Sequence, residues 1–415
     1  MPVIIKNILT LNAIYIARLA LPLMLLPMLT RRLSPDGYGI YMYAMAVSMW
    51  LTVLIEYGFN VHSTRAISAG GESGRVTVVV GTQSARLLLS LAALPVCVLL
   101  GSLLKIFQGN EYWAFVAWLV GFAGALVPVF YFQAKEALRT VAITEFIAGV
   151  FLLVLTYGLV RGDADLPVLA LIVASTRIGV TAYLTYAMLT DLPGRRPTLF
   201  DPTAGLRYLR DGFQLFLFQA VVSFYTSFNA VFLGFFRPPA EVGQYTSAER
   251  LIRAALTLMV QASLAIFPRL TKLKSEDAAA MGRLRSISLG AIFGVGCMGL
   301  AATLLLSEPV SRLLFPAQAA HVAELLNILC FLFPAVALSN VLGFLYMLVD
   351  RSDRLLSTIM MAVAAVNVVA AYQLIQARGA IGMAIGWVAI EWLAAIALTV
   401  TVYFTKSRRQ GSTGD

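Results

Sequence analysis

The chain has 415 residues, of which 60% are hydrophobic and 13% are charged, and its mean hydropathy is +0.83. This composition excludes an ordinary soluble domain and indicates a protein that crosses a membrane many times. The net charge of +10 falls mostly between apolar runs, so we interpret it as a topology signal and expect no nucleic-acid partner. The two histidines, His62 and His321, are too few and too scattered for a histidine metal site.

Twelve windows are long and apolar enough to cross a hydrocarbon core about 30 Å thick. They cover residues 7–29, 38–58, 80–104, 112–133, 141–160, 166–189, 211–235, 243–267, 286–307, 322–348, 355–375 and 379–404. The connections between them are short, and the longest spans about residues 190–210. The sequence therefore predicts an all-α polytopic membrane protein with 12 transmembrane helices.

Lysine and arginine residues are distributed unevenly over the two sides that these spans define. The side of the N-terminus takes most of them, including Arg65, Arg75 and Arg86. The opposite side takes Arg31, Arg32, Lys105, Arg161, Arg237, Arg312 and Arg378. The positive-inside rule then places both termini in the cytoplasm. Arginines in connections, such as Arg31 and Arg32, are expected to be solvated or to face lipid headgroups.

An internal repeat becomes visible when the second half is shifted by 204 positions without a gap. Leu29, Pro35, Gly39, Tyr41, Ala44, Leu54 and Arg65 then meet Leu233, Pro239, Gly243, Tyr245, Ala248, Leu258 and Arg269. We expect two six-helix lobes related by a pseudo-two-fold axis, with a site between them. The lobes would cover residues 1–190 and 211–405, joined by a cytoplasmic linker at 191–210 and followed by a cytoplasmic tail at 406–415. The alternative is that two unrelated membrane hairpins share a Pro–Gly turn.

Four arginines, Arg18, Arg177, Arg250 and Arg253, lie within the expected spans. An arginine at a helix centre costs roughly 2.5–3.5 kcal/mol, so it usually faces a wet interior or a partner. Glu249 precedes Arg253 by four residues, and a self-neutralised ion pair is therefore the alternative for Arg253. A cluster of arginines in a hydrated cavity suits a phosphate or diphosphate group, because the guanidinium fork binds such oxygens in pairs.

Polar side chains form stripes along several of the same spans. The residues that we expect to line a central cavity are Tyr15, Tyr41, Ser48, Thr52, Gln219, Thr226, Asn229, Thr257 and Gln261. Hydrogen bonding between helices is the alternative for each stripe, since Ser and Thr commonly join helices inside membranes.

Three motifs occur in order along the chain. The first is EYGFNVHSTR, residues 56–65, after the hairpin LTRRLSPDGYGIY; the second is FQAKE, residues 132–136, followed by ALRTVAI; the third is VGQYTSAERL with FPRL further along. Together they resemble the Wzx-type O-antigen and polysaccharide-repeat flippases of the multidrug/oligosaccharidyl-lipid/polysaccharide (MOP) superfamily. The family commonly has Asp where Glu56 stands, and often an acidic residue where Asn229 stands, which puts in doubt a cation-binding role for Asn229.

The resemblance implies a non-enzymatic transporter with a MOP/MATE-like fold. It would move a polyprenyl-diphosphate-linked oligosaccharide from the cytoplasmic to the periplasmic leaflet of a bacterial inner membrane by alternating access. By analogy with this superfamily, Arg18, Arg250 and Arg253 would hold the diphosphate. We include Arg177 as a further candidate because it lies at a similar depth in its span. Its partners would be that lipid, membrane lipids, and a glycan polymerase with other assembly proteins.

Carboxylates within the spans are candidates for coupling transport to an ion gradient. Glu391, Glu56 and Glu249 lie in apolar surroundings, where a carboxylate can take up a proton or bind Na⁺, so H⁺ or Na⁺ is the only cofactor expected. A static ion pair of Glu391 with Arg177 or with another cation is the alternative.

Two other functions are weighed against a flippase. An organic-cation exporter of the same fold would need carboxylates and aromatic residues at its site, whereas the spans carry surplus arginines. A membrane glycan polymerase or ligase would need a large loop or a catalytic constellation, and the sequence shows neither.

Overall fold

The computed structural model describes residues 21, 23–192, 200–350 and 353–411. Within these ranges the chain forms helices and no strand, as expected for an all-α protein. The chain divides into two compact units, residues 1–243 and 244–415, which are described separately.

Eight helical segments in the described ranges are long and apolar enough to cross a membrane. They are Pro35–Ala69, Gly74–Leu103, Tyr112–Ala134, Leu138–Leu159, Asp163–Asp191, Ala279–Leu314, Pro316–Leu348 and Leu355–Phe404. The chain is therefore a multi-pass membrane protein. Most of the span expected at 7–29 lies outside the described residues, and many side chains within those expected at 211–235 and 243–267 are not described, so the eight segments do not test these three spans.

The last of these segments is two helices rather than one. At Gly379 the backbone takes φ 57° and ψ −130°, a left-handed conformation that side chains with a Cβ rarely adopt. A Cβ on Gly382 would lie 1.9 Å from the carbonyl oxygen of Leu374, and Val363 packs against Ile390. The chain thus folds back on itself at Gly379, close to the connection expected between spans 355–375 and 379–404.

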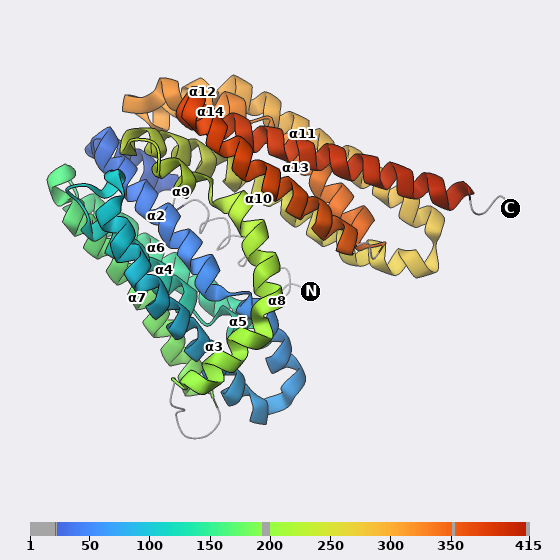
Figure 1. Ribbon diagram of the computed structural model, residues 1–415, viewed down its shortest axis with the longest axis horizontal. Helices are drawn as coiled ribbons and strands as arrows, with labels where there is room; N and C mark the ends of the chain where they lie inside the picture. Colours follow the sequence, from blue (N-terminus) through green and yellow to red (C-terminus); the bar gives the residue numbers. More distant parts are fainter. Residues whose placement is uncertain (1–20, 22, 193–199, 351–352, 412–415) are drawn as a thin grey trace, which may run out of the picture. The chain divides into compact units, whose positions relative to one another are not determined.

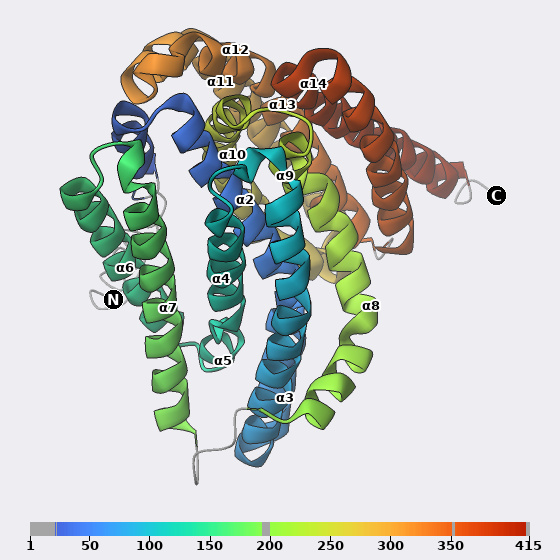
Figure 2. The ribbon, with the colours of Figure 1, turned by 60° about the vertical axis from the view of Figure 1, so that its left-hand side comes forward.

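The first unit is built from eight labelled α-helices (Figures 1 and 2). They are α2 (Pro35–Glu56), α3 (Phe59–Leu103), α4 (Tyr112–Leu126), α5 (Val129–Ala134), α6 (Leu138–Leu159), α7 (Leu166–Asp191), α8 (Pro202–Ser227) and α9 (Asn229–Gly234). Helices α2, α3 and α7 pack against α4, while α6 packs on α7 and α8 packs on α3. This places α4 at the centre of the unit. In the most apolar 18 residues of the segment Tyr112–Ala134, which contains α4, 61% of the residues are buried, whereas the corresponding share for α6 is 6%.

Proline and polar caps fix several helix boundaries in this unit. Helix α2 begins with Pro35 after Ser34, whose hydroxyl accepts a hydrogen bond from the amide of Gly37. Helix α4 ends at Leu126, because Pro128 has no amide hydrogen with which to continue the helix. The expected span 112–133 is therefore a broken helix, α4 followed by α5.

The second unit contains the larger part of α10 (Pro239–Glu276), whose first residues belong to the first unit. It continues with α11 (Ala278–Leu314), α12 (Ala319–Leu329), α13 (Leu332–Asn340), the π-helix η4 (Val341–Leu348) and α14 (Asp353–Gly411). Helix α11 packs on α12 and α13, and α13 packs on α14. The expected span 322–348 is interrupted as well, since it comprises α12, α13 and η4.

Candidate functional site

Arg177 forms an ion pair inside the first unit. Its Nη1 lies 2.8 Å and 3.0 Å from the two carboxylate oxygens of Glu145 on α6. Its Nε and Nη2 would each lie 3.4 Å from a Cβ placed on Gly124, and the Thr52 hydroxyl would lie 2.9 Å from the same point. Residues from α2, α4, α6 and α7 therefore meet around Arg177. The carboxylate partner of Arg177 within this unit is therefore Glu145.

Arg253 forms the centre of a second charged cluster, in the second unit. Its Nε and Nη2 donate to one oxygen of Glu249, at 2.9 Å and 2.6 Å, so the ion pair considered from the i,i+4 spacing is present. The guanidinium carbon lies 4.4 Å from the ring centroid of Trp387 on α14. Glu391, one turn beyond Trp387, is close enough for its charge to interact with Arg253. Arg253 thus interacts with two carboxylates and one aromatic ring.

Arg250 differs from Arg253, although only three residues separate them on α10. Its side chain is half-buried, and it has no ion-pair partner among the described residues. Arg253 remains 30% exposed despite its ion pair. Of these two arginines, Arg250 is thus without an ion pair among the described residues, whereas Arg253 is held by Glu249.

Most of the expected cavity-lining residues of the first unit are packed between helices. Tyr41 is 3% exposed and meets the ring of Trp113 edge-on. Ser48 is buried and donates to the carbonyl of Met45, while Thr52 donates to the carbonyls of Ser48 and Gly121. Asn229 is 3% exposed, and its amide nitrogen has no hydrogen-bond partner among the residues that the structure describes.

The remaining expected residues divide between described and undescribed positions. Thr257 lies on α10 and donates to the carbonyl of Arg253. Tyr15 and Arg18 lie outside the described residues, and the side chains of Gln219, Thr226 and Gln261 are likewise not described.

Arg86 is a buried arginine that sequence reasoning missed, because it was counted with the cytoplasmic connections. It lies inside α3 and is fully buried. Its Nη1 donates to the carbonyl of Val127, at the break between α4 and α5, and its Nη2 donates to Asn60 Oδ1, at 3.2 Å and 3.0 Å. Asn60 also bonds the side chain of Glu56. Glu56 therefore belongs to an ionic network around a helix break.

Arg285 has the same kind of environment in the second unit. It is 6% exposed on α11, and its Nε donates to the carbonyl of Leu345 in the π-helix η4 at 2.8 Å. Its Nη2 lies 2.8 Å from a carboxylate oxygen of Asp350. Each unit thus uses a buried arginine to bind carbonyls where a membrane helix departs from α-geometry. The signal in the sequence is that Arg86 stands inside the apolar window 80–104 and Arg285 directly before the window 286–307.

Arg32 was expected to be solvated or to face headgroups, and the structure adds a contact with the end of α6. Its Nη1 donates to the carbonyl of Val160 at 2.6 Å and to that of Tyr157 at 2.5 Å. Its guanidinium carbon lies 4.6 Å from the Tyr157 ring centroid. The side chain therefore caps the C-terminal end of α6, where unpaired carbonyls and the helix dipole favour a cation.

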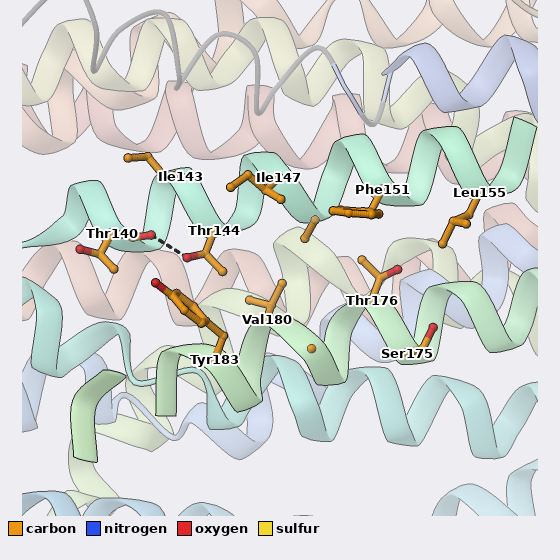
Figure 3. Close-up of a pocket in the computed structure, with 12 residues that line it drawn as sticks. Thr140, Ile143, Thr144, Ile147, Phe151, Leu155, Ser175, Thr176, Val180 and Tyr183 are labelled. Carbon is orange, nitrogen blue, oxygen red and sulfur yellow. Dashed lines mark hydrogen bonds between the residues drawn. The ribbon is translucent and has the colours of Figure 1, made fainter. Parts of the chain in front are cut away.

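A groove of about 770 Å³ runs between α6 and α7 (Figure 3). In Figure 3, Tyr183 of α7 lies across from Thr140 and Thr144 of α6, and Thr176 of α7 lies across from Phe151 and Leu155 of α6. The hydroxyls of Thr144, Ser175 and Thr176 donate to carbonyls of their own helices. No arginine or carboxylate is among the described lining residues. The groove therefore suits hydrocarbon and not a diphosphate.

The fold and these charged clusters can be compared with known proteins. Two proteins called "Putative O-antigen transporter" are similar over most of their length. The relative from Shigella dysenteriae is 27% identical over 385 residues, covering 92% of this chain and 95% of that protein. The relative from Escherichia coli (strain K12) is 24% identical over 402 residues, covering 94% of each chain. They confirm the resemblance to O-antigen transporters.

Solved structures share the fold at low sequence identity. The lipid II flippase MurJ in an inward closed conformation has a TM-score of 0.77 at 13% identity, covering 95% of this chain and 87% of that one. An outward-facing multidrug resistance MATE family transporter of the MOP superfamily has a TM-score of 0.58 at 16% identity, covering 95% and 94%. The fold is therefore that of MurJ and MATE proteins. A family model described as "Polysaccharide biosynthesis protein" matches residues 4–274. Because this match takes in more than half of the chain, the protein belongs to the polysaccharide biosynthesis protein family.

Proposed function

We propose that this protein moves a polyprenyl-diphosphate-linked oligosaccharide across the bacterial cytoplasmic membrane, from the inner to the outer leaflet. Support comes from the relatives named O-antigen transporters and from the lipid II flippase among the fold neighbours. The observation that carries the proposal is the pair of arginines on α10, since Arg250 and Arg253 place positive charge inside a membrane helix. A charged side chain inside a membrane helix is energetically costly, and such residues usually bind an ion or a substrate.

In this proposal Arg250 and Arg253 hold the diphosphate. Arg253 presents its guanidinium against the ring of Trp387, which fixes its plane, and Glu249 accepts hydrogen bonds from its Nε and Nη2. Arg250 contributes a second cation one turn earlier. Arg18 and Arg177 complete the proposed diphosphate-binding set, and the polar residues Tyr15, Gln219, Thr226, Thr257 and Gln261 line the path of the glycan.

We further propose that an ion gradient drives the movement. Glu249 and Glu391 both interact with Arg253, and H⁺ or Na⁺ would compete with this arginine for either carboxylate. A cation bound there would loosen the hold of Glu249 on Arg253, so the guanidinium would become available to the diphosphate. Glu56, tied to Arg86 through Asn60, is the corresponding carboxylate of the first unit.

The proposed architecture is 12 transmembrane helices in two six-helix lobes, residues 1–190 and 211–405, that alternate access. Both termini would face the cytoplasm, as the excess of Lys and Arg on that side supports. The substrate lipid and the surrounding membrane lipids are the proposed partners, together with a glycan polymerase and other assembly proteins that receive the product.

The test is a flipping assay with the purified protein in liposomes. A polyprenyl-diphosphate oligosaccharide carrying a fluorophore on its sugar is incorporated in both leaflets, and dithionite is added outside. Without flipping, only about half of the fluorescence is lost; the protein should raise the loss, and an opposing ion gradient should change its rate. The proposal is wrong if the quenched fraction stays at the protein-free value while a fluorescent organic cation is transported.

A further inference from the structure

A second groove, of about 530 Å³, lies between the first described helix, residues 23–32, and α6. Its length is apolar, with Met24 and Met28 on one wall and Leu153 and Val154 on the other. The described lining also contains two arginines, Arg31 and Arg32. The groove is therefore amphipathic, with apolar walls and a cationic end.

The cationic end coincides with the ends of two helices. The helical residues 23–32 stop at Arg32, and α6 stops at Leu159. The segments that follow these two helices contact each other, because the amide of Ser34 donates a hydrogen bond to Asp163 Oδ1 at 2.8 Å. Helix α6 is one of the apolar segments able to cross the membrane. The arginines thus lie at the level where apolar helix ends and lipid headgroups begin.

The apolar walls face outward. Met24 is 56% exposed and Val154 is 60% exposed, and exposed apolar side chains on a membrane-spanning helix meet lipid chains instead of water. A hydrocarbon chain can therefore lie along the groove.

Arg32 is held in a fixed position with part of its guanidinium unused. Its Nη1 makes the contacts with the end of α6, whereas Nε and Nη2 have no partner among the described residues and are not buried. Arg31, its neighbour, is exposed. An anion at this point would accept hydrogen bonds from a fork that is already oriented, which lowers the entropy lost on binding.

We propose that this groove is a binding site for an anionic phospholipid such as phosphatidylglycerol. The phosphate would lie at Arg31 and Arg32, and one acyl chain would follow Met24, Met28 and Val154. The groove between α6 and α7 provides an internal comparison. It accepts hydrocarbon but has no described cation, so it would not distinguish one headgroup from another.

Native mass spectrometry of the full chain in detergent tests the proposal. The protein is titrated with phosphatidylglycerol or with phosphatidylcholine of the same acyl chains. Wild type should bind phosphatidylglycerol more tightly, and Arg31→Gln should reduce that preference about fivefold, since one arginine near a headgroup contributes about 1 kcal/mol. Val154→Trp fills the apolar part of the groove and should reduce the amount of either lipid that is bound. Arg312→Gln, which removes an arginine that is 72% exposed elsewhere, should change neither.

The choice of variants keeps a folding defect separate from lost binding. Arg32→Gln removes the cap of α6 as well as a cation, so the conclusion depends on Arg31→Gln and Val154→Trp, which leave that cap in place. Equal affinity of wild type for the two lipids, or an unchanged preference in Arg31→Gln, would overturn the proposal. Displacement of phosphatidylglycerol by an equal concentration of polyprenyl diphosphate would also overturn it and assign the groove to the substrate lipid.

Discussion

Gly39 and Gly243, which occupy equivalent positions in the repeat, lie against each other: a Cβ on Gly243 would be 3.0 Å from the Cα of Gly39. A Cβ on Gly39 would be 1.9 Å from the carbonyl oxygen of Pro239. The amide of Ala240 lies 3.2 Å from Asp36 Oδ1, and these residues are also 204 positions apart. The beginnings of α2 and α10 therefore approach so closely that no side chain fits between them.

Gly39→Ala should destabilise the protein. The added methyl group cannot be accommodated unless α2 or the beginning of α10 shifts, and overpacking of this kind costs about 1–3 kcal/mol. Gly290→Ala is the matched control, because a Cβ there meets nothing within 4 Å on the helix α11, and alanine favours a helix. Thermal unfolding in detergent should give a lower midpoint for the first variant only; equal midpoints would show that the contact is dispensable.

Arg253→Ala should abolish transport without reducing the amount of protein in the membrane. The side chain is the proposed diphosphate ligand, and its loss also leaves Glu249 unpaired. Arg253→Lys keeps the charge but not the two-pronged geometry, so it should retain a small part of the activity. Arg312→Ala serves as the control at an exposed arginine. The flipping rate in liposomes measures the effect, and wild-type rates in Arg253→Ala would remove this residue from the site.

Arg285→Leu should lower the stability strongly. It removes the ion pair with Asp350 and the hydrogen bond to the carbonyl of Leu345, and removing one member of a buried ion pair costs about 3–5 kcal/mol. Arg283→Leu, two residues earlier on the same helix, changes an exposed arginine and should be nearly neutral. Denaturation followed by tryptophan fluorescence would compare the two. The interpretation fails if both variants unfold alike.

Asp201 should make the beginning of α8 sensitive to acid. Hydrogen bonds from the Thr203 hydroxyl and then from the Ala204 amide hold the pKa of this carboxyl below its usual range. A carboxyl whose pKa is lowered on folding contributes stability above its unfolded-state pKa and loses it as the pH falls through the folded value. We expect wild type to be more stable than Asp201→Asn at pH 7, and the two midpoints to converge below about pH 4. A constant difference between them at every pH would contradict this.

The sequence located most helices but not their interruptions. The apolar run at 38–58 anticipates α2, and Gly379 falls within a few residues of an expected connection, because hydropathy records which residues tolerate hydrocarbon. Helix α3 instead begins at Phe59, far before its apolar window, since a helix continues through a polar segment when other elements pack on it. The π-helix η4 has no signature in hydropathy, as it depends on the contacts that Arg285 makes from another helix.

The sequence indicated the partners of some arginines but not of others. The spacing of Glu249 and Arg253 indicated their pairing as the alternative to an arginine that faces a cavity, because both lie on one helix. The partners of Arg177 and Arg86 lie on other helices, and hydropathy contains no information about which helices meet. Trp387 was missed altogether, since its contact with Arg253 joins residues more than 100 positions apart.

The two buried arginines have a consequence for how the chain is made. Arg86 leaves the ribosome 41 residues ahead of Val127, whose carbonyl it binds, and Arg285 is 60 residues ahead of Leu345. Alone in the bilayer, each would carry an uncompensated charge worth roughly 2.5–3.5 kcal/mol. Helices α3 and α11 should therefore stay at the translocon until the following helices arrive, and enter the bilayer together with them.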